Sequence, residues 1–178
     1  MPELRITGGE LGGRRIRVPR GGAVRPTTER VREALFSILG DLSEARVLDL
    51  FCGSGALAIE ALSRGAAEAT LVDTRPRTAR DNLESLGLSE RARTVRSDAA
   101  RFLRRAEEGS FDLVLCDPPY RLADRLAAEL DPLIRRVLAP GGRVVVEASP
   151  DRPLPLDLPL LVERAYGDTL IRIHGGEG

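Results

Sequence analysis

The stretch Val47-Leu48-Asp49-Leu50-Phe51-Cys52-Gly53-Ser54-Gly55-Ala56-Leu57-Ala58 decides the fold of this chain. Its first part is a short apolar run, typical of a buried strand, and a glycine turn then opens an apolar helix. This order is how nucleoside-cofactor sites begin in open α/β sheets. Because glycine has no Cβ, Gly53 and Gly55 allow a ligand to touch the backbone.

The segments that follow repeat the alternation of strand and helix. From residue 46 onward, short apolar runs alternate with helical patterns, which indicates βαβ units and a mostly parallel, doubly wound α/β sheet. Strands are predicted at 46–50, 69–73, 92–96, 111–116 and 143–148, and helices at 55–64, 76–86, 99–107 and 122–138. Asp131-Pro132 can kink or restart the last helix. After the proline-rich link 150–159, the runs 160–165 and 169–174 predict a closing antiparallel hairpin.

The first 40 residues have a different pattern. Residues 3–8 and 14–18 alternate around a glycine-rich stretch and predict a hairpin with Arg15 and Arg17 on one face. A helix is expected to follow, with Thr27 as its N-cap and Gly40 at its end. This region holds eight arginines against four acidic residues, a net charge of +4. Such an excess suits contact with a phosphate backbone, although a solvated charged arm has the same composition.

Composition limits the class of protein. With 178 residues, of which 42% are hydrophobic and 30% charged, the chain is long enough for one domain with a sizeable core. No apolar run approaches the roughly 18 residues of a membrane helix, and the N-terminus lacks a signal-peptide pattern, so a cytoplasmic protein is expected. Lysine is absent, which excludes Schiff-base chemistry and a P-loop. Cys52 and Cys116 have no metal-ligand spacing and are expected to be buried thiols.

Three acidic residues lie at or just beyond the carboxyl ends of successive strands, where open α/β sheets bind ligands. Asp49 places a negative charge where a pyrophosphate would approach, which disfavours NAD and suits a cationic ligand without phosphates, such as S-adenosylmethionine. Asp73 can accept hydrogen bonds from both hydroxyls of a ribose, or it can cap the next helix. Asp98, with Ala99, can flank an adenine or can likewise cap a helix.

The tetrapeptide Asp117-Pro118-Pro119-Tyr120 ends the apolar run 113–116. Two prolines make this segment stiff and extended, with carbonyl groups that no ladder partner uses. The Asp117 carboxylate and the Pro118 carbonyl can each accept one hydrogen of an exocyclic amine on a nucleobase, while Tyr120 stacks on the base. Taken alone, the tetrapeptide is equally typical of an ordinary strand exit.

Together, the motif Asp49-Leu-Phe-Cys-Gly-Ser-Gly55, Asp73, Asp98 and the box 117–120 resemble a Rossmann-type methyltransferase that uses S-adenosylmethionine. The segment Arg25-Pro26-Thr27-Thr28-x-Arg30-Val31-Arg32-Glu33-Ala34-Leu35-Phe36, with the glycines at 8–9 and 12–13, further resembles the bacterial RsmD family of 16S ribosomal RNA guanine-N2 methyltransferases. The resemblance covers nearly the whole chain. One departure is the link 150–159, which replaces the helix that usually follows the fifth strand.

The resemblance implies methyl transfer to guanine N2 in 16S ribosomal RNA or in an assembling 30S subunit, by a monomer without metal. It implies a catalytic box at Asp117, Pro118, Pro119 and Tyr120, and a cofactor site formed by Asp49, Phe51, Gly53, Gly55, Asp73, Thr74, Asp98, Ala99 and Asp117. RNA contacts are expected at Arg15, Arg17, Arg25, Thr27, Thr28 and Arg30. The expected division is an extension at 1–40 and a methyltransferase domain at 41–178. His174 is expected to be a surface or packing residue.

Three other interpretations stay open at this level. The box 117–120 also resembles that of adenine-N6 DNA methyltransferases, although these 178 residues are not expected to include a separate target-recognition domain. The chain can instead be a non-catalytic RNA-binding assembly factor that keeps the fold. The glycine turn also passes loosely for the fingerprint of a nicotinamide-dependent reductase. Cofactor-binding measurements separate the last two from the first interpretation, and mapping the methylated base separates the adenine-N6 alternative.

Overall fold

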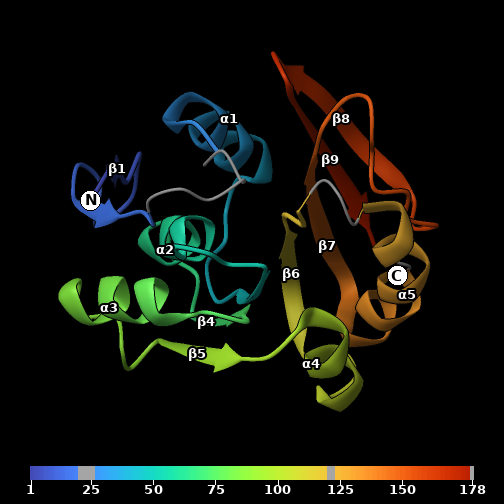
Figure 1. Ribbon diagram of the computed structural model, residues 1–178, viewed down its shortest axis with the longest axis horizontal. Helices are drawn as coiled ribbons and strands as arrows, with labels where there is room; N and C mark the ends of the chain where they lie inside the picture. The colour runs from blue at the N-terminus through green and yellow to red at the C-terminus, as the bar shows by residue number, and fades with distance from the viewer. Residues whose placement is uncertain (20–26, 120–122, 177–178) are drawn as a thin grey trace.

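The computed structural model describes residues 1–19, 27–119 and 123–176. Tyr120 and Arg25, both predicted site residues, lie outside the described residues. Within them, a mixed sheet has the strand order β5-β4-β3-β6-β7-β9-β8, and a separate hairpin pairs β1 with β2 (Figure 1).

The strands are β1 (Glu3–Arg5), β2 (Arg15–Arg17), β3 (Arg46–Leu50), β4 (Glu68–Asp73), β5 (Ala92–Arg96), β6 (Phe111–Cys116), β7 (Leu138–Ala148), β8 (Leu160–Tyr166) and β9 (Thr169–Gly175). The helices are α1 (Glu29–Leu39), α2 (Ala56–Ser63), α3 (Arg77–Ser85), α4 (Ala99–Arg105) and α5 (Ala123–Val137). Strands β5, β4, β3, β6 and β7 run parallel, and β9 and β8 close the sheet with antiparallel pairings. The predicted doubly wound, mostly parallel seven-stranded sheet with an N-terminal hairpin and helix is confirmed.

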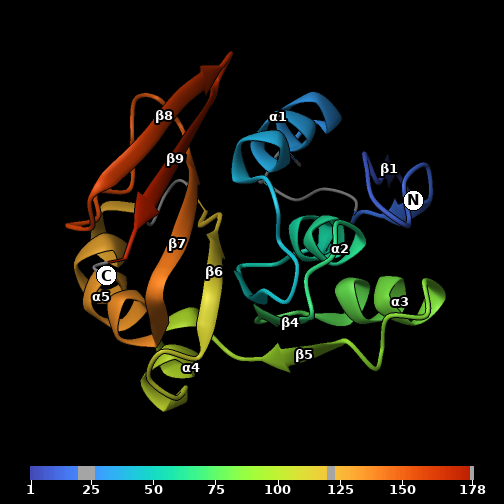
Figure 2. The same cartoon turned by 180° about the vertical axis from the view of Figure 1, so that it is seen from behind.

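Helices cover both faces of the sheet, α1, α2 and α3 on one side and α4 and α5 on the other (Figures 1 and 2). Strand residues alternate between the two layers because successive side chains point to opposite faces. Val47, Leu113 and Val145 pack into the cluster that contains α1 and α2. Leu48 and Val114 pack into the cluster that contains α4 and α5. Both faces of the central strands are therefore buried, as their continuous apolar runs require.

The N-terminal hairpin packs onto this fold through its apolar side chains. Ile6 and Ile16 are buried in the same cluster as α1 and α2. The central residue of β2 is buried and its two neighbours are exposed, so Arg15 and Arg17 share the outer face as predicted. The N-cap of α1 is Thr28, whose hydroxyl oxygen accepts a hydrogen bond from Val31 N at 3.3 Å. The prediction of Thr27 as the cap is therefore wrong by one residue.

An extended segment replaces the helix that usually follows the fifth strand of this fold. Residues 149–159 contain no helix, and Leu154 and Leu158 insert from this segment into the core against α5. Asp157 N donates a hydrogen bond to Asp131 Oδ1 at 2.9 Å, which fixes the segment to α5. Apolar side chains on an extended chain thus replace the missing helix as the cover of this sheet edge.

The chain around α5 differs from the prediction in two respects. Helix α5 continues through Pro132 as one helix, so Asp131 does not cap a second helix; it pairs instead with Arg135 at 3.2 Å. Strand β7 begins at Leu138, directly after α5 and earlier than expected. Leu138 pairs with Phe111, and a register shift before Leu113 accommodates the glycine pair at 141–142.

The cysteines and the single histidine are buried. Cys52 and Cys116 are free thiols, and burial raises the pKa of each, so both are inert packing residues. His174 is 3% exposed, and its Nδ1 lies 2.9 Å from Leu158 O. Of the two expectations for His174, packing is correct and surface exposure is wrong.

Candidate active site

The glycine turn and the proline box lie side by side at the carboxyl edge of the sheet. Strands β3 and β6 pair in register, with Leu50 opposite Cys116. The next residues along the two strands are Phe51, which begins the glycine turn, and Asp117, which begins the box. Parallel neighbours are about 4.8 Å apart, so the two motifs share one site.

The glycine turn between β3 and α2 has a backbone that only certain residues can adopt. Gly53 and Gly55 have φ values of +54° and +80°, and Phe51 has φ +61°. A positive φ at a bulky residue such as Phe51 is strained, and strained residues of this kind gather at ligand sites. A Cβ on Gly55 would lie 2.8 Å from Leu71 Cδ2, whereas the Cβ position of Gly53 is open. The turn therefore packs tightly on its sheet side and leaves room on its outer side.

The amides of this turn are already in use. Gly53 N donates to Asp73 Oδ2 at 3.0 Å, and Gly55 N donates to Cys52 O at 2.7 Å. A phosphate site at a glycine turn needs amides that point at the ligand. Since these two amides bind protein oxygens and two carboxylates lie nearby, the site is poorly suited to a pyrophosphate. This geometry disfavours the nicotinamide alternative.

Asp49 is buried beneath the turn. The residue is 2% exposed, and its Oδ2 accepts one hydrogen bond, from Ala58 N at 3.2 Å. Burial raises its pKa from 3.8 to about 7, the hydrogen bond opposes that rise, and the neighbouring Asp73 adds to it. A cation placed next to Asp49 would favour the ionised form. The site therefore suits a positively charged ligand, such as a sulfonium, better than an anion.

Asp73 ends β4 and organises the loop around it. Its two oxygens accept from Gly53 N and, at 2.8 Å, from Arg75 N. It does not cap α3, whose N-cap is Pro76 without a side-chain bond. A carboxylate has about four acceptor positions, so two remain for the hydroxyls of a ribose. Thr74 is exposed beside it.

Asp98 caps α4, and this was one of its two predicted roles. Its Oδ1 accepts from Arg101 N at 2.8 Å. Ala99, the first residue of the helix, is 5% exposed and belongs to the core around α4. A role of this pair beside an adenine stays a prediction.

Asp117 lies among other carboxyl groups. Strands β6 and β7 pair Cys116 with Val146, so Asp117 and Glu147 follow at the same level of the sheet. Burial is the main cause that raises the pKa of Asp117 well above its ordinary value, and the charges of Glu147 and Asp49 add to it. Pro118 is buried and Pro119 is partly exposed. The carboxyl is thus held rigidly at the edge and binds protons more readily than a free aspartate.

Glu147 is a site residue that sequence reasoning missed. It is 3% exposed, near the end of β7, and it accepts a hydrogen bond from the hydroxyl of Thr27. Burial raises its pKa, while the bond from Thr27 and the charge of Arg32 lower it. An acidic residue directly after the apolar run 144–146 was the available signal, because buried charges are rare without a function or a partner.

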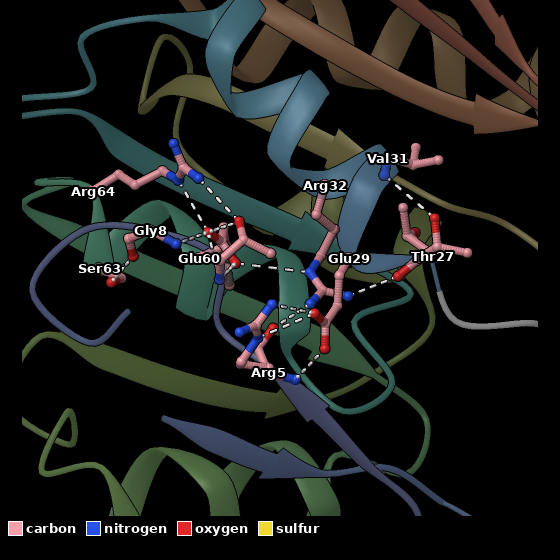
Figure 3. A network of polar contacts seen from close by, with 12 residues as sticks. Arg5, Gly8, Thr27, Glu29, Val31, Arg32, Glu60, Ser63 and Arg64 are labelled. Carbon is pink, nitrogen blue, oxygen red and sulfur yellow. Dashed lines mark hydrogen bonds and ion pairs between the residues drawn. The ribbon is translucent and has the colours of Figure 1, made fainter. Parts of the chain in front are cut away.

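A polar network attaches the N-terminal extension to α2 (Figure 3). Arg32 on α1 is 1% exposed, and it donates to Thr27 O at 2.7 Å and to Arg5 O at 2.5 Å. Its Nε lies 3.7 Å from Glu60 Oε2 on α2. Glu60 also accepts from Gly8 N at 3.0 Å, and so ties the hairpin to the helix that follows the glycine turn.

The predicted RNA-contact residues lie in different surroundings. Arg15, Arg17 and Arg30 are exposed, and Arg15 pairs with Glu3 at 3.4 Å. Thr28 is exposed at the start of α1, whereas Thr27 is buried against Glu147. Thr27 therefore faces the edge that carries Asp117 rather than the outer surface of the extension.

Among the described residues, no group of three or more His, Cys, Asp or Glu residues is arranged to hold a metal ion. None of the helices in the described part of the chain combines the length and the apolar character needed to cross a membrane.

Comparison with known proteins identifies relatives along almost the whole chain. Residues 4–174 match the family described as Conserved hypothetical protein 95. The Bacillus subtilis (strain 168) protein YlbH is 35% identical over 98% of this chain and 100% of its own length. The Ribosomal RNA small subunit methyltransferase D of Haemophilus influenzae is 33% identical, covering 97% of this chain and 93% of that protein. The solved structure of the Escherichia coli protein yhhF has a TM-score of 0.85, with 36% identity and 99% of each chain covered.

The matches agree with the geometry of the carboxyl edge, since a methyltransferase requires a cofactor turn and an acceptor site within reach of one another. The chain therefore belongs to the family of the ribosomal RNA small subunit methyltransferases D, and it is a methyltransferase.

Proposed function

We propose that this protein transfers a methyl group from S-adenosylmethionine to the exocyclic N2 amine of a guanine in 16S ribosomal RNA. The in-register pairing of Leu50 with Cys116 carries the proposal, because it brings the glycine turn and Asp117 to one edge. The names of the relatives supply the substrate class. The proposed setting is the cytoplasm, with a monomer acting on the RNA or on the assembling 30S subunit.

The residues around the turn fit S-adenosylmethionine. Asp49 and Asp73 supply negative charge and acceptors, and the open side of Gly53 leaves room for a ligand. We place the ribose at Asp73 and Thr74, the adenine near Asp98 and Ala99, and the remainder of the ligand along Phe51, Gly53 and Gly55. When bound, the cofactor supplies a methyl group activated by a sulfonium, and transfer breaks its C–S bond as a C–N bond forms.

The protein's own contribution is to hold the amine. A guanine N2 shares its lone pair with the ring, so attack requires the nitrogen to become pyramidal. The Asp117 carboxylate and the Pro118 carbonyl accept its two hydrogens and stabilise that geometry. After transfer the nitrogen carries an extra proton, and Asp117 accepts it readily because its pKa is raised. Pro119 keeps the segment extended, and Tyr120 offers a ring on which the base stacks.

The extension at 1–40 is the proposed RNA contact, with 41–178 as the methyltransferase domain. Exposed Arg15, Arg17 and Arg30 lie on elements that the Arg32–Glu60 network fixes to α2. Arginine contacts of this kind bind the phosphate backbone and position the substrate without reading sequence. Arg25 and Thr28 are proposed for the same role.

A transfer assay with nucleoside analysis tests the proposal. The protein is incubated with labelled S-adenosylmethionine and unmodified 16S RNA, free and as 30S particles, and the RNA is digested to nucleosides. N2-methylguanosine supports the proposal. Label on adenine N6 favours the alternative of an adenine methyltransferase, and absence of both label and cofactor binding favours a non-catalytic assembly factor.

A further inference from the structure

Two carboxyl groups, not one, face the position proposed for the target base. Asp117 and Glu147 follow a registered pair on neighbouring parallel strands, Cys116 and Val146. Residues at the same level of a parallel pair project from the same face. Leu115 and Val145, two residues earlier, both pack toward α1 and α2, so Glu147 projects toward that layer as well.

Among the described residues, a single hydrogen bond reaches the carboxyl group of Glu147. The hydroxyl of Thr27 donates to Oε2. No hydrogen bond from the described residues reaches Oε1. A buried carboxyl without further partners carries a large cost, and proteins keep such groups chiefly at functional sites. The charge at Glu147 is therefore better explained by a ligand than by packing.

The orientation of Glu147 is set from the N-terminal extension. Thr27 donates to it, and Arg32 in turn donates to the Thr27 carbonyl at 2.7 Å. Arg32 is itself held by Arg5 O and by Glu60 (Figure 3). This chain of contacts fixes the position of Oε2 and therefore also the direction in which Oε1 points. A site that selects one base requires such a rigid support.

Guanine and adenine differ at the atom next to the reacting amine. Guanine carries an N1–H beside N2, so both atoms donate along one edge of the base. Adenine carries an unprotonated N1 beside N6, and that nitrogen accepts. A carboxylate next to Asp117 would bind the N1–H of guanine, and it would face the lone pair of adenine N1 unfavourably.

We propose that Glu147 Oε1 accepts the N1–H of the target guanine, and that Thr27 is the positioning residue that orients Glu147. The proposal rests on the proposed function and deepens it, because it assigns base selectivity to a residue outside the box 117–120. That box alone suits any exocyclic amine. Glu147 then supplies the preference for guanine.

The test compares guanine with 2-aminopurine at the nucleotide that the wild-type protein methylates. 2-Aminopurine keeps the 2-amino group and lacks the N1–H, and it can be placed in the RNA by ligation. Single-turnover rates are measured for both substrates with wild-type protein, Glu147→Gln and Thr27→Val. Asp112→Asn, which removes the partner of Arg46 at the far end of β6, is the matched control.

The wild-type protein should prefer guanine by about 10- to 100-fold, the range expected when a charged acceptor loses its donor. In Glu147→Gln this preference should fall at least about tenfold, because the amide can donate to N1 of 2-aminopurine. Thr27→Val should change it in the same direction, and Asp112→Asn should keep the wild-type ratio.

Equal wild-type rates for the two bases would overturn the proposal, whatever the stability of the variants. The same holds if Glu147→Gln slows both substrates equally, since that is the effect of a purely structural residue. These outcomes leave the proposed function intact. Failure of the wild-type protein to methylate guanine N2 at all would refute the proposed function itself.

Discussion

Replacing Asp49 by asparagine should make the protein less sensitive to pH. Asparagine keeps an oxygen that can accept from Ala58 N and removes the ionisable group. The folded wild-type protein holds the Asp49 proton with a pKa of about 7, against 3.8 as the ordinary value. The folded state therefore binds more protons than the unfolded state between these values. The stability that Asp49 contributes is fully present below the lower pKa and decreases as the pH rises toward the upper pKa.

The size of the effect follows from the two pKa values. A rise from 3.8 to about 7 corresponds to about 4 kcal/mol of unfolding free energy, at about 1.4 kcal/mol per pH unit. Between about pH 5 and pH 8 the wild-type protein should lose about 2–3 kcal/mol through this group. The Asp49→Asn variant should not show this loss.

Urea unfolding at about pH 5 and pH 8 measures the difference in unfolding free energy between variant and wild type. That difference should shift by about 2–3 kcal/mol in favour of the variant as the pH rises. Asp112→Asn is a control whose difference should stay constant, because Arg46 holds the pKa of Asp112 below its usual range, and the group is therefore ionised in both folded and unfolded protein at these two pH values. A difference for Asp49→Asn that stays constant within about 0.5 kcal/mol across the two conditions would refute this reasoning.

Three further predictions concern the turn, the helix cap and the catalytic carboxyl. Gly55→Ala should destabilise the protein by at least about 1 kcal/mol and weaken cofactor binding, since φ is +80° and Leu71 Cδ2 lies 2.8 Å from the new Cβ. Thermal unfolding measures the stability, and calorimetry measures the cofactor affinity. An unchanged melting temperature would contradict the strain argument. Thr28→Ala should lower the free energy of unfolding by about 1 kcal/mol, as measured by urea unfolding, because the helix loses its cap. Thr28→Ser keeps the hydroxyl and should lower it little. Equal losses of stability in the two variants would point to another cause. The methyl-transfer rate should decrease as acid protonates Asp117, at a pH above the range of ordinary carboxyl groups. Glu147→Gln should move this decrease to lower pH, because it removes a charge that raises the pKa of Asp117. If the pH–rate profiles of the two proteins coincide, the two groups are not coupled.

The sheet could be predicted because each central strand is a continuous apolar run with turn residues around it. Strand β5 at Ala92–Arg96 and strand β6 at Phe111–Cys116 begin and end where the pattern placed them. Parallel strands buried on both faces need such runs, so the signal is local. The neighbourhood of Asp49 and Asp117 followed from the same rule, since each comes at or near the carboxyl end of a strand.

The predictions were wrong where two neighbouring residues are equally good candidates, or where the contact partner is distant in the sequence. Thr27 and Thr28 are both good caps by residue type, and only the engagement of Thr27 by Glu147 decides between them. That contact joins residues 120 positions apart, and no periodic pattern reports it. Pro132 lies inside α5 although proline usually ends or kinks a helix. The apolar residues of the link 150–159 pack against α5, and this tertiary contact has no local sequence pattern that would predict it.

The role assigned to Asp117 can be tested by single-turnover methyl transfer with Asp117→Asn, together with calorimetric titration of S-adenosylmethionine. We expect the cofactor still to bind and the rate of N2 methylation to be at least about 100-fold lower, because a preorganised acceptor of developing charge is lost. If the variant methylated guanine N2 at the wild-type rate, the proposed mechanism at the edge of β3 and β6 would be wrong.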